Sequence, residues 1–127
     1  MNNRKRVVIG KIGLDSHDVG VRYVSKKLIE SGFEVIFVQF YEPKELVNVM
    51  IQEDADIAGA SFMTGGHIVI AKGILEEMKK NNVNIPLILG GIIPVQDHKV
   101  LKEMGVYDVF SSGSAMEDIV NSFKKAA

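Results

Sequence analysis

Residues 11–20, KIGLDSHDVG, combine side chains that can hold a metal at the end of an apolar run. His17 can bind a transition metal as a neutral imidazole near neutral pH. Asp15 stands two residues earlier and can accept a hydrogen bond from the other ring nitrogen, which fixes the tautomer and makes the metal-facing nitrogen more basic. Lys11 can pair with Asp15 and extend this relay. The spacing predicts one histidine ligand supported by a Lys11–Asp15 pair.

The rest of the chain offers little for a metal site made of protein alone. The sequence has no cysteine, which excludes disulfides, thiolate metal sites and cysteine nucleophiles. His67 and His98 belong to other segments, so a zinc site with three or four protein ligands is poorly supported. We expect His67 to open a helix as a structural or interface residue and His98 to lie at the surface. A single protein ligand suits a metal that a macrocycle already holds.

Short apolar runs alternate with segments of helical period, which predicts repeated βα units around a parallel sheet. Strands are expected at 6–13, 33–40, 56–62, 85–91 and 107–113, and the last two helices at about 96–104 and 114–125. Pro43 and Ser114 are expected at helix starts, and Gly32 and Gly105 at helix ends. The predicted fold is α/β, a flavodoxin-like (Rossmann-like) doubly wound five-stranded parallel sheet of order 2-1-3-4-5 with helices on both faces. Residues 1–127 are expected to form a single domain.

Composition limits the partners. The 127 residues carry fifteen basic and sixteen acidic side chains, so no charge excess favours nucleic acid or an anionic membrane. No apolar run reaches the roughly 18 to 20 residues of a membrane span, and no signal peptide opens the chain. We expect a cytoplasmic protein without a nucleic-acid or membrane partner.

Small and polar residues gather where the predicted strands end. The segments GLDSHDVG, SFMTGG, GGIIP and SSGS follow the first, third, fourth and fifth strands. Parallel strands place these ends at one edge of the sheet, where ligands of open α/β folds bind. Any one of these loops is equally well explained by ordinary turn chemistry. Together they predict a cradle for an extended ligand.

The same residues resemble a known cofactor-binding signature. Asp15, His17 and Gly20 match the pattern Asp-x-His-x-x-Gly, and Ser61 to Met63 and Gly90-Gly91 match its two accompanying elements. From about residue 6 to residue 123, the chain resembles the cobalamin (B12)-binding domain or small subunit of the methylmalonyl-CoA mutase family of adenosylcobalamin-dependent acyl-CoA mutases.

This resemblance implies a role for each matching residue. His17 would be the lower axial ligand of the cobalt, with Asp15 and Lys11 as the relay behind it. Gly20 and Gly91 would leave room for the nucleotide tail of the cofactor, Gly90 would permit a tight turn, and Ser61 would hydrogen-bond the benzimidazole. The remaining cofactor-binding positions that the resemblance implies are Ser16, Asp18, Val19, Met63, Thr64, Gly65, Phe110, Ser111 and Ser114.

Some of these positions depart from the family pattern. Ser16 and Ser111 stand where glycine is frequent, Val19 where arginine is common, and Met63 where leucine is usual. The exchange of leucine for methionine conserves volume and is expected to be mild. None of the departures removes His17 or Ser61.

The family resemblance also implies a reaction and a partner. The reaction would be the rearrangement of an acyl-CoA carbon skeleton with adenosylcobalamin, by an isomerase subunit that is inactive alone. The acyl-CoA would bind a separate large subunit with a (β/α)₈ barrel, in a hetero-oligomer. One alternative is a corrinoid methyl carrier, which ordinarily has an N-terminal helical cap that the few residues before the first strand do not provide. Another is a signalling receiver, which has an aspartate where this chain has Ser61 and a lysine where it has SSGS.

Overall fold

Strands and helices alternate along the whole chain in the computed structural model, which describes residues 4–13, 19–62, 66–111 and 113–127. The strands are β1 (Arg6–Ile12), β2 (Glu34–Phe40), β3 (Ile57–Phe62), β4 (Leu87–Gly91) and β5 (Asp108–Val109). The helices are α1 (Val19–Glu30), α2 (Pro43–Gln52), α3 (His67–Lys80), the short 3₁₀ helix η1 (Val95–Asp97), α4 (His98–Met104) and α5 (Met116–Ala126).

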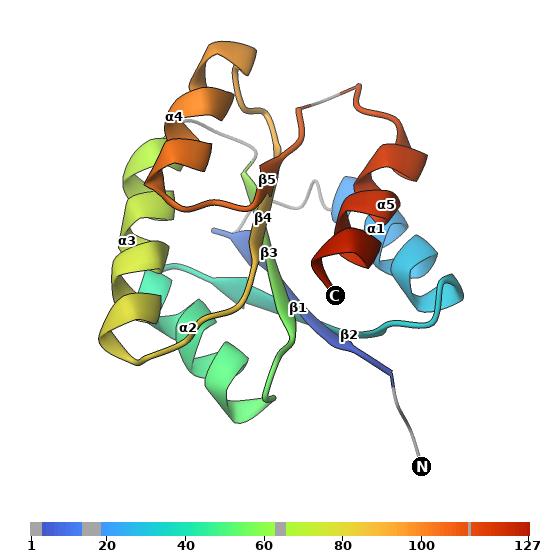
Figure 1. The fold of residues 1–127 in the computed structure, drawn as a ribbon, viewed down its shortest axis with the longest axis horizontal. Coiled ribbons are helices and arrows are strands. Elements are labelled where there is room, and N and C mark those ends of the chain that lie inside the picture. Colours follow the sequence, from blue (N-terminus) through green and yellow to red (C-terminus); the bar gives the residue numbers. More distant parts are fainter. Residues whose placement is uncertain (1–3, 14–18, 63–65, 112) are drawn as a thin grey trace.

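The strands form one parallel sheet of order β2-β1-β3-β4-β5. Helices α1 and α5 cover one face, and α2, α3 and α4 cover the other (Figure 1). This arrangement confirms the predicted doubly wound fold and its strand order. Every strand therefore ends at the same edge of the sheet, which we call the carboxyl edge.

Three of the predicted helix boundaries are confirmed. Pro43 is the first residue of α2, where its missing N–H costs no hydrogen bond. The Glu45 carboxylate accepts hydrogen bonds from the two backbone N–H groups just before the helix, at 3.0 and 2.7 Å. Gly32 and Gly105 end α1 and α4 with φ of +98° and +121°, a conformation that favours glycine.

The boundaries near the C-terminus differ from the prediction. The last strand was expected at 107–113, but only Asp108 and Val109 pair with β4. Beyond them the Ser114 N–H donates to the Ser111 carbonyl at 3.1 Å, so the chain turns instead of continuing the strand. The prediction of Ser114 as a helix cap is also wrong, because α5 begins at Met116 and no side chain caps it.

The apolar core lies in two clusters, one on each face of the sheet. The larger cluster, under α2, α3 and α4, includes Phe40, Leu46, Phe62, Ile74 and Leu101, all fully buried. The smaller cluster, under α1 and α5, includes Val7, Leu28, Ile57, Ile88 and Phe123. The second face therefore has fewer side chains to fill the space between sheet and helices.

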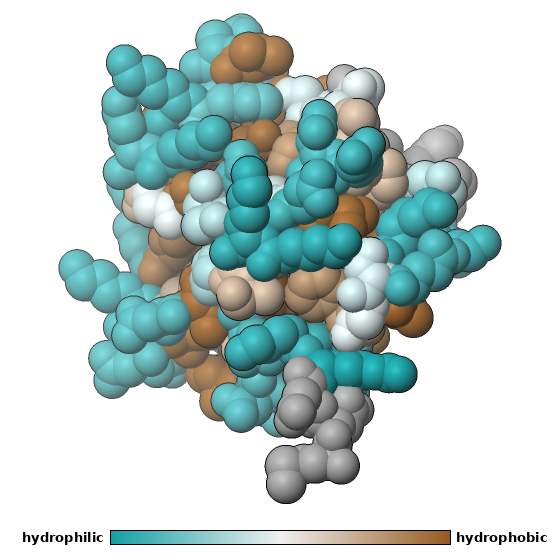
Figure 2. Space-filling model, turned by 45° about the vertical axis from the view of Figure 1, so that its right-hand side comes forward, coloured by the Kyte–Doolittle hydropathy of each residue, from teal (hydrophilic) through white to brown (hydrophobic). Residues whose placement is uncertain are grey.

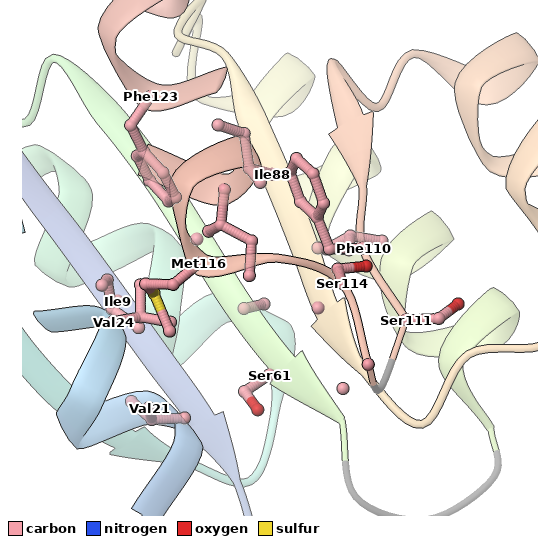
Figure 3. Close-up of a pocket in the computed structure, with 17 residues that line it drawn as sticks. Ile9, Val21, Val24, Ser61, Ile88, Phe110, Ser111, Ser114, Met116 and Phe123 are labelled. Atoms are coloured by element: carbon pink, nitrogen blue, oxygen red, sulfur yellow. The ribbon is translucent and has the colours of Figure 1, made fainter. Parts of the chain in front are cut away.

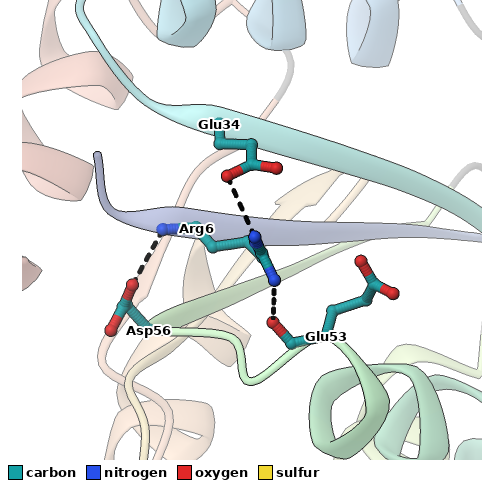
Figure 4. Close-up of polar contacts among 4 residues, drawn as sticks. All are labelled: Arg6, Glu34, Glu53 and Asp56. Atoms are coloured by element: carbon teal, nitrogen blue, oxygen red, sulfur yellow. Dashed lines mark hydrogen bonds and ion pairs between the residues drawn. The ribbon is translucent and has the colours of Figure 1, made fainter. Parts of the chain in front are cut away.

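Arg6 joins three segments at the amino edge of the sheet (Figure 4). Its backbone N–H donates to Asp56 Oδ2 at 2.8 Å, and its Nη1 donates to the Glu53 carbonyl at 2.7 Å. Its Nη2 lies 3.2 Å from Glu34 Oε2. These contacts hold β1 against β2 and against the connection from α2 to β3, at the end of the sheet opposite the glycine- and serine-rich loops.

Hydrophilic side chains cover most of the surface in Figure 2, with small apolar patches between them. Within the described residues, no helix combines the length and the apolar character needed to cross a bilayer. Among the side chains that the structure describes, the most exposed large apolar ones are Val69 and Val95, which are 76% and 72% exposed. Both follow the carboxyl ends of strands, at the start of α3 and in η1.

Candidate functional site

A cavity of about 280 Å³ lies between the sheet and the helices α1 and α5, towards the carboxyl edge (Figure 3). Its floor consists of two rows of residues that pair across neighbouring strands. One row is Ile9, Gly59 and Ile88, and the next contains Ser61 and Gly90. The helix residues of the wall are Val21, Val24, Met116, Ile119 and Phe123.

Lys11 belongs to the same row as Ser61. The register pairs Lys11 with Ser61 and Ser61 with Gly90, so the three residues share one face of the sheet. Lys11 is only 4% exposed, and no ion pair between the described residues includes it. A buried ammonium is costly without a carboxylate partner. Asp15, four residues further on, therefore stays the predicted partner, although it lies outside the described residues.

The two adjacent glycines at the end of β4 differ in backbone conformation and in the space around them. Gly91 has a φ of +115°, and a Cβ there would lie 2.0 Å from the Phe62 carbonyl oxygen. The turn at the end of β4 therefore requires glycine at position 91 and not, as expected, at position 90, and the space for a cofactor tail at Gly91 stays a prediction. Gly90 has room for a Cβ, whose nearest neighbour would be the Phe110 carbonyl oxygen at 3.8 Å. No protein atom fills the space beside Gly90 where a side chain would lie, and this space is part of the cavity.

Three serines line the cavity, and they are not equivalent. Ser61 and Ser114 have no hydrogen bond from their side chains among those between described residues, and Figure 3 shows both beside the cavity. The Ser111 hydroxyl donates to the Ile93 carbonyl at 2.5 Å and lies 2.7 Å from His98 Nε2. Its polar atoms are thus engaged by the protein. His98, which was expected at the surface, is only partly exposed, and its ring makes this contact.

Several residues predicted from separate loops meet at this one cavity: Ser61, Gly90, Gly91, Phe110, Ser111 and Ser114. Others lie outside the described residues and stay predictions: Asp15, Ser16, His17, Asp18, Met63, Thr64 and Gly65. The side chains at positions 19 and 20 belong with them. The helix residues of the wall were not predicted as site residues, because their period assigns them to ordinary helix faces.

The chemistry of the cavity favours binding over acid–base catalysis. Its described lining consists of aliphatic, aromatic and methionine side chains, glycines and serines, with no titratable group. Its volume falls just under the range of roughly 300 to 1,000 Å³ that is typical of pockets for whole ligands. The described residues contain no cluster of three or more histidine, aspartate or glutamate side chains that could hold a metal. The cavity suits one small, mostly apolar part of a larger ligand.

Residues 5–120 match the family model of the B12 binding domain, and the chain therefore belongs to the B12-binding domain family. Within that family it is similar to small subunits of acyl-CoA mutases. It is 31% identical to the 2-hydroxyisobutanoyl-CoA mutase small subunit of Aquincola tertiaricarbonis, over 94% of this chain and 89% of that protein. It is 34% identical to the pivalyl-CoA mutase small subunit of Xanthobacter autotrophicus, over 91% of this chain and 78% of that protein.

Longer proteins and solved structures complete the comparison. The chain is 33% identical to methylmalonyl-CoA mutase of Escherichia coli, but it spans only 17% of that protein. A cobalamin-binding protein of Desulfitobacterium hafniense superposes with a TM-score of 0.81 at 21% identity, over 98% of this chain and 60% of that one. A receiver domain of Francisella superposes with a TM-score of 0.71 at 16% identity, over 98% of this chain and 100% of that one. At these identities the structures show a shared fold alone.

Proposed function

We propose that residues 1–127 form one cobalamin-binding small subunit of an adenosylcobalamin-dependent acyl-CoA mutase. The observation that carries this proposal is the cavity at the carboxyl edge, in a chain of the B12-binding domain family. When bound, the cofactor would supply the radical that starts a carbon-skeleton rearrangement. This chain would supply a ligand, an orientation and a polar anchor.

The cavity fits the nucleotide tail of cobalamin better than its corrin ring. Dimethylbenzimidazole is flat and mostly apolar, like the wall formed by α1 and α5. Ser61 can offer its hydroxyl to a ring nitrogen, because no hydrogen bond among the described residues engages it, and Gly90 leaves space on the floor. The volume of about 280 Å³ leaves the much larger corrin outside, at the carboxyl edge.

With the tail inside the chain, the lower face of the cobalt would be open to a protein ligand. We propose His17 for this position, with Asp15 accepting a hydrogen bond from its other ring nitrogen and Lys11 pairing with Asp15. Lys11 supports this relay because it is buried on the cavity face of β1, beside Ser61. These two residues would position the histidine and would not touch the substrate.

The carboxyl edge also has features of a protein interface. Val69, Val95 and Ile92 are 76%, 72% and 53% exposed, and all three follow strand ends at this edge. Exposed apolar side chains that gather in one region mark interaction surfaces. We propose that a large subunit with a (β/α)₈ barrel covers this edge, holds the acyl-CoA and excludes water from the corrin. The mutase small subunits among the relatives favour this function over methyl transfer.

The axial ligand can be tested directly by electron paramagnetic resonance. The full chain, labelled with ¹⁵N-histidine, is loaded with cob(II)alamin. Ligation by a protein histidine changes the nitrogen splitting from a triplet to a doublet. His17→Ala should abolish the doublet, whereas His67→Gln, the matched control at another histidine, should retain it. A doublet that survives in His17→Ala, or a triplet in the labelled wild-type chain, would refute His17 as the ligand.

The mutase function needs the partner. The chain mixed with its large subunit and adenosylcobalamin should isomerise an acyl-CoA thioester, which chromatography of the thioesters detects. Neither subunit should do so alone. Methyl transfer from a methylated corrinoid on this chain, without any acyl-CoA isomerisation by the pair, would instead support the carrier alternative.

A further inference from the structure

A series of side-chain hydrogen bonds lies beside the cavity, and the proposed contacts with the cofactor do not account for it. It starts from two consecutive residues, Asp97 at the end of η1 and His98 at the start of α4. His67 Nε2 lies 2.8 Å from Asp97 Oδ2, and His98 Nε2 lies 2.7 Å from Ser111 Oγ. Ser111 also donates to the Ile93 carbonyl. These hydrogen bonds therefore connect the segments that follow β3, β4 and β5.

The direction of each hydrogen bond follows from the atoms involved. A carbonyl oxygen only accepts, so the single hydroxyl proton of Ser111 goes to the Ile93 carbonyl. The Ser111 oxygen must then accept from His98, and His98 Nε2 carries the hydrogen. In the same way His67 Nε2 donates to the Asp97 carboxylate.

These contacts hold the segment around Ser111, which forms part of the cavity lining. Ser111 lies on the cavity lining, directly after Phe110, whose backbone N–H donates to the Leu89 carbonyl at 2.8 Å. The short strand β5 ends at Val109, so strand pairing does not extend to Ser111. The contacts from His98 and to the Ile93 carbonyl hold Ser111 instead. Side-chain hydrogen bonds that hold a binding residue in one position reduce the ordering cost of binding.

We propose that His98 and Ser111, supported by the His67–Asp97 pair, are positioning residues that preshape the cavity for the nucleotide tail of the cofactor. The inference rests on the proposed function, since it assigns the tail to this cavity. Ser111 would act through its position and not through a hydrogen bond to the ligand. His98 would never touch the cofactor and would still affect its affinity.

The test compares two corrinoids in titrations of the full chain followed by absorption spectroscopy. Cobalamin has the nucleotide tail, and cobinamide has the corrin ring without it. His98→Ala, which loses one hydrogen bond, should weaken cobalamin binding by about three- to tenfold, and Ser111→Ala, which also loses the bond to the Ile93 carbonyl, should weaken it by at least as much. The double variant should be little weaker than Ser111→Ala alone, because that variant already lacks the contact with His98. Cobinamide affinity should be unchanged throughout.

Conservative variants separate positioning from general structural damage. His98→Gln keeps an N–H donor near the position of Nε2, and Asp97→Asn keeps an acceptor for His67. Both should bind cobalamin within about twofold of the wild-type chain, since each retains its hydrogen bond. An equal loss of cobinamide and cobalamin affinity in His98→Ala would overturn the proposal, as would wild-type cobalamin affinity in that variant.

Hydrogen exchange of the ligand-free chain tests the same contacts without the cofactor. The peptides that contain Ile93 and Ser111 should exchange faster in His98→Ala than in His98→Gln. If wild-type chain binds neither corrinoid, the proposed function fails, and faster exchange in His98→Ala still supports the positioning role of His98. Unchanged exchange in His98→Ala would overturn that role whatever the corrinoid titrations show.

Discussion

Adjacent glycines at the end of β4 give a sharp test of the cavity, because alanine should have opposite effects at the two positions. In Gly91→Ala the new Cβ would lie 2.0 Å from the Phe62 carbonyl oxygen, at a φ of +115°. The backbone strain costs about 1 to 3 kcal/mol. Displacement of the strand end also endangers the 2.8 Å hydrogen bond from the Ile92 N–H to the Phe62 carbonyl, worth about 1 kcal/mol. We expect a loss of about 2 to 4 kcal/mol in the free energy of unfolding.

In Gly90→Ala the new Cβ meets nothing closer than the Phe110 carbonyl oxygen at 3.8 Å, an ordinary contact. The free energy of unfolding should therefore change by no more than about 1 kcal/mol. The methyl group would instead occupy space on the cavity floor. Overfilling a packed site costs about 1 to 3 kcal/mol, so cobalamin affinity should fall about tenfold or more.

Urea unfolding measures the stability of both variants, and titration with cobalamin and cobinamide measures binding. Gly90→Ala should retain its affinity for cobinamide, which has no tail to meet the new methyl group. Equal destabilisation of the two variants would show that the assignment of the turn to Gly91 alone is wrong. Wild-type cobalamin affinity in Gly90→Ala would show that the tail does not approach this glycine.

Three further substitutions separate binding from stability. Ser61→Ala should weaken cobalamin binding about fivefold through the loss of one hydrogen bond, with unchanged cobinamide affinity in the same titration. Ser122→Ala removes a 2.7 Å hydrogen bond from a buried hydroxyl to Asp108, so urea unfolding should show a loss of about 1 to 2 kcal/mol while cobalamin affinity stays at the wild-type value. Arg6→Ala breaks the side-chain contacts at the amino edge and should lower the free energy of unfolding in urea by about 1 to 2 kcal/mol. A change in cobalamin affinity in this variant would contradict the separation of the two edges.

The fold could be predicted from the sequence because each strand is a nearly continuous apolar run and each helix has an apolar face. Pro43, Gly32 and Gly105 mark their boundaries through backbone conformations that do not depend on distant residues. The end of the chain was harder to predict. The pattern could not show that Ser111 turns away from β4 to bond the Ile93 carbonyl, since this contact spans eighteen positions in sequence.

The site could be predicted only in part, for a similar reason. Glycines and serines at strand ends identified the floor and one rim of the cavity. The apolar residues of the cavity wall have the spacing of an ordinary helix face, so the sequence pattern does not distinguish Val24 and Phe123 from core residues. The turn was assigned to Gly90 instead of Gly91 because only the backbone shows which of them has the positive φ. His98 was missed because its partner, Ser111, comes from another loop.

The unequal filling of the two sheet faces has a consequence for how the protein folds. The cluster under α1 and α5 has fewer buried residues than the cluster on the other face, and it ends at the cavity. Helices that pack on an incomplete core open more readily, so α1 and α5 should be the least protected helices of the ligand-free chain. A bound nucleotide tail would supply the missing core from outside the chain. The cofactor would then act as a removable part of the hydrophobic interior, and its loading would be measurable as the thermal stability of these two helices.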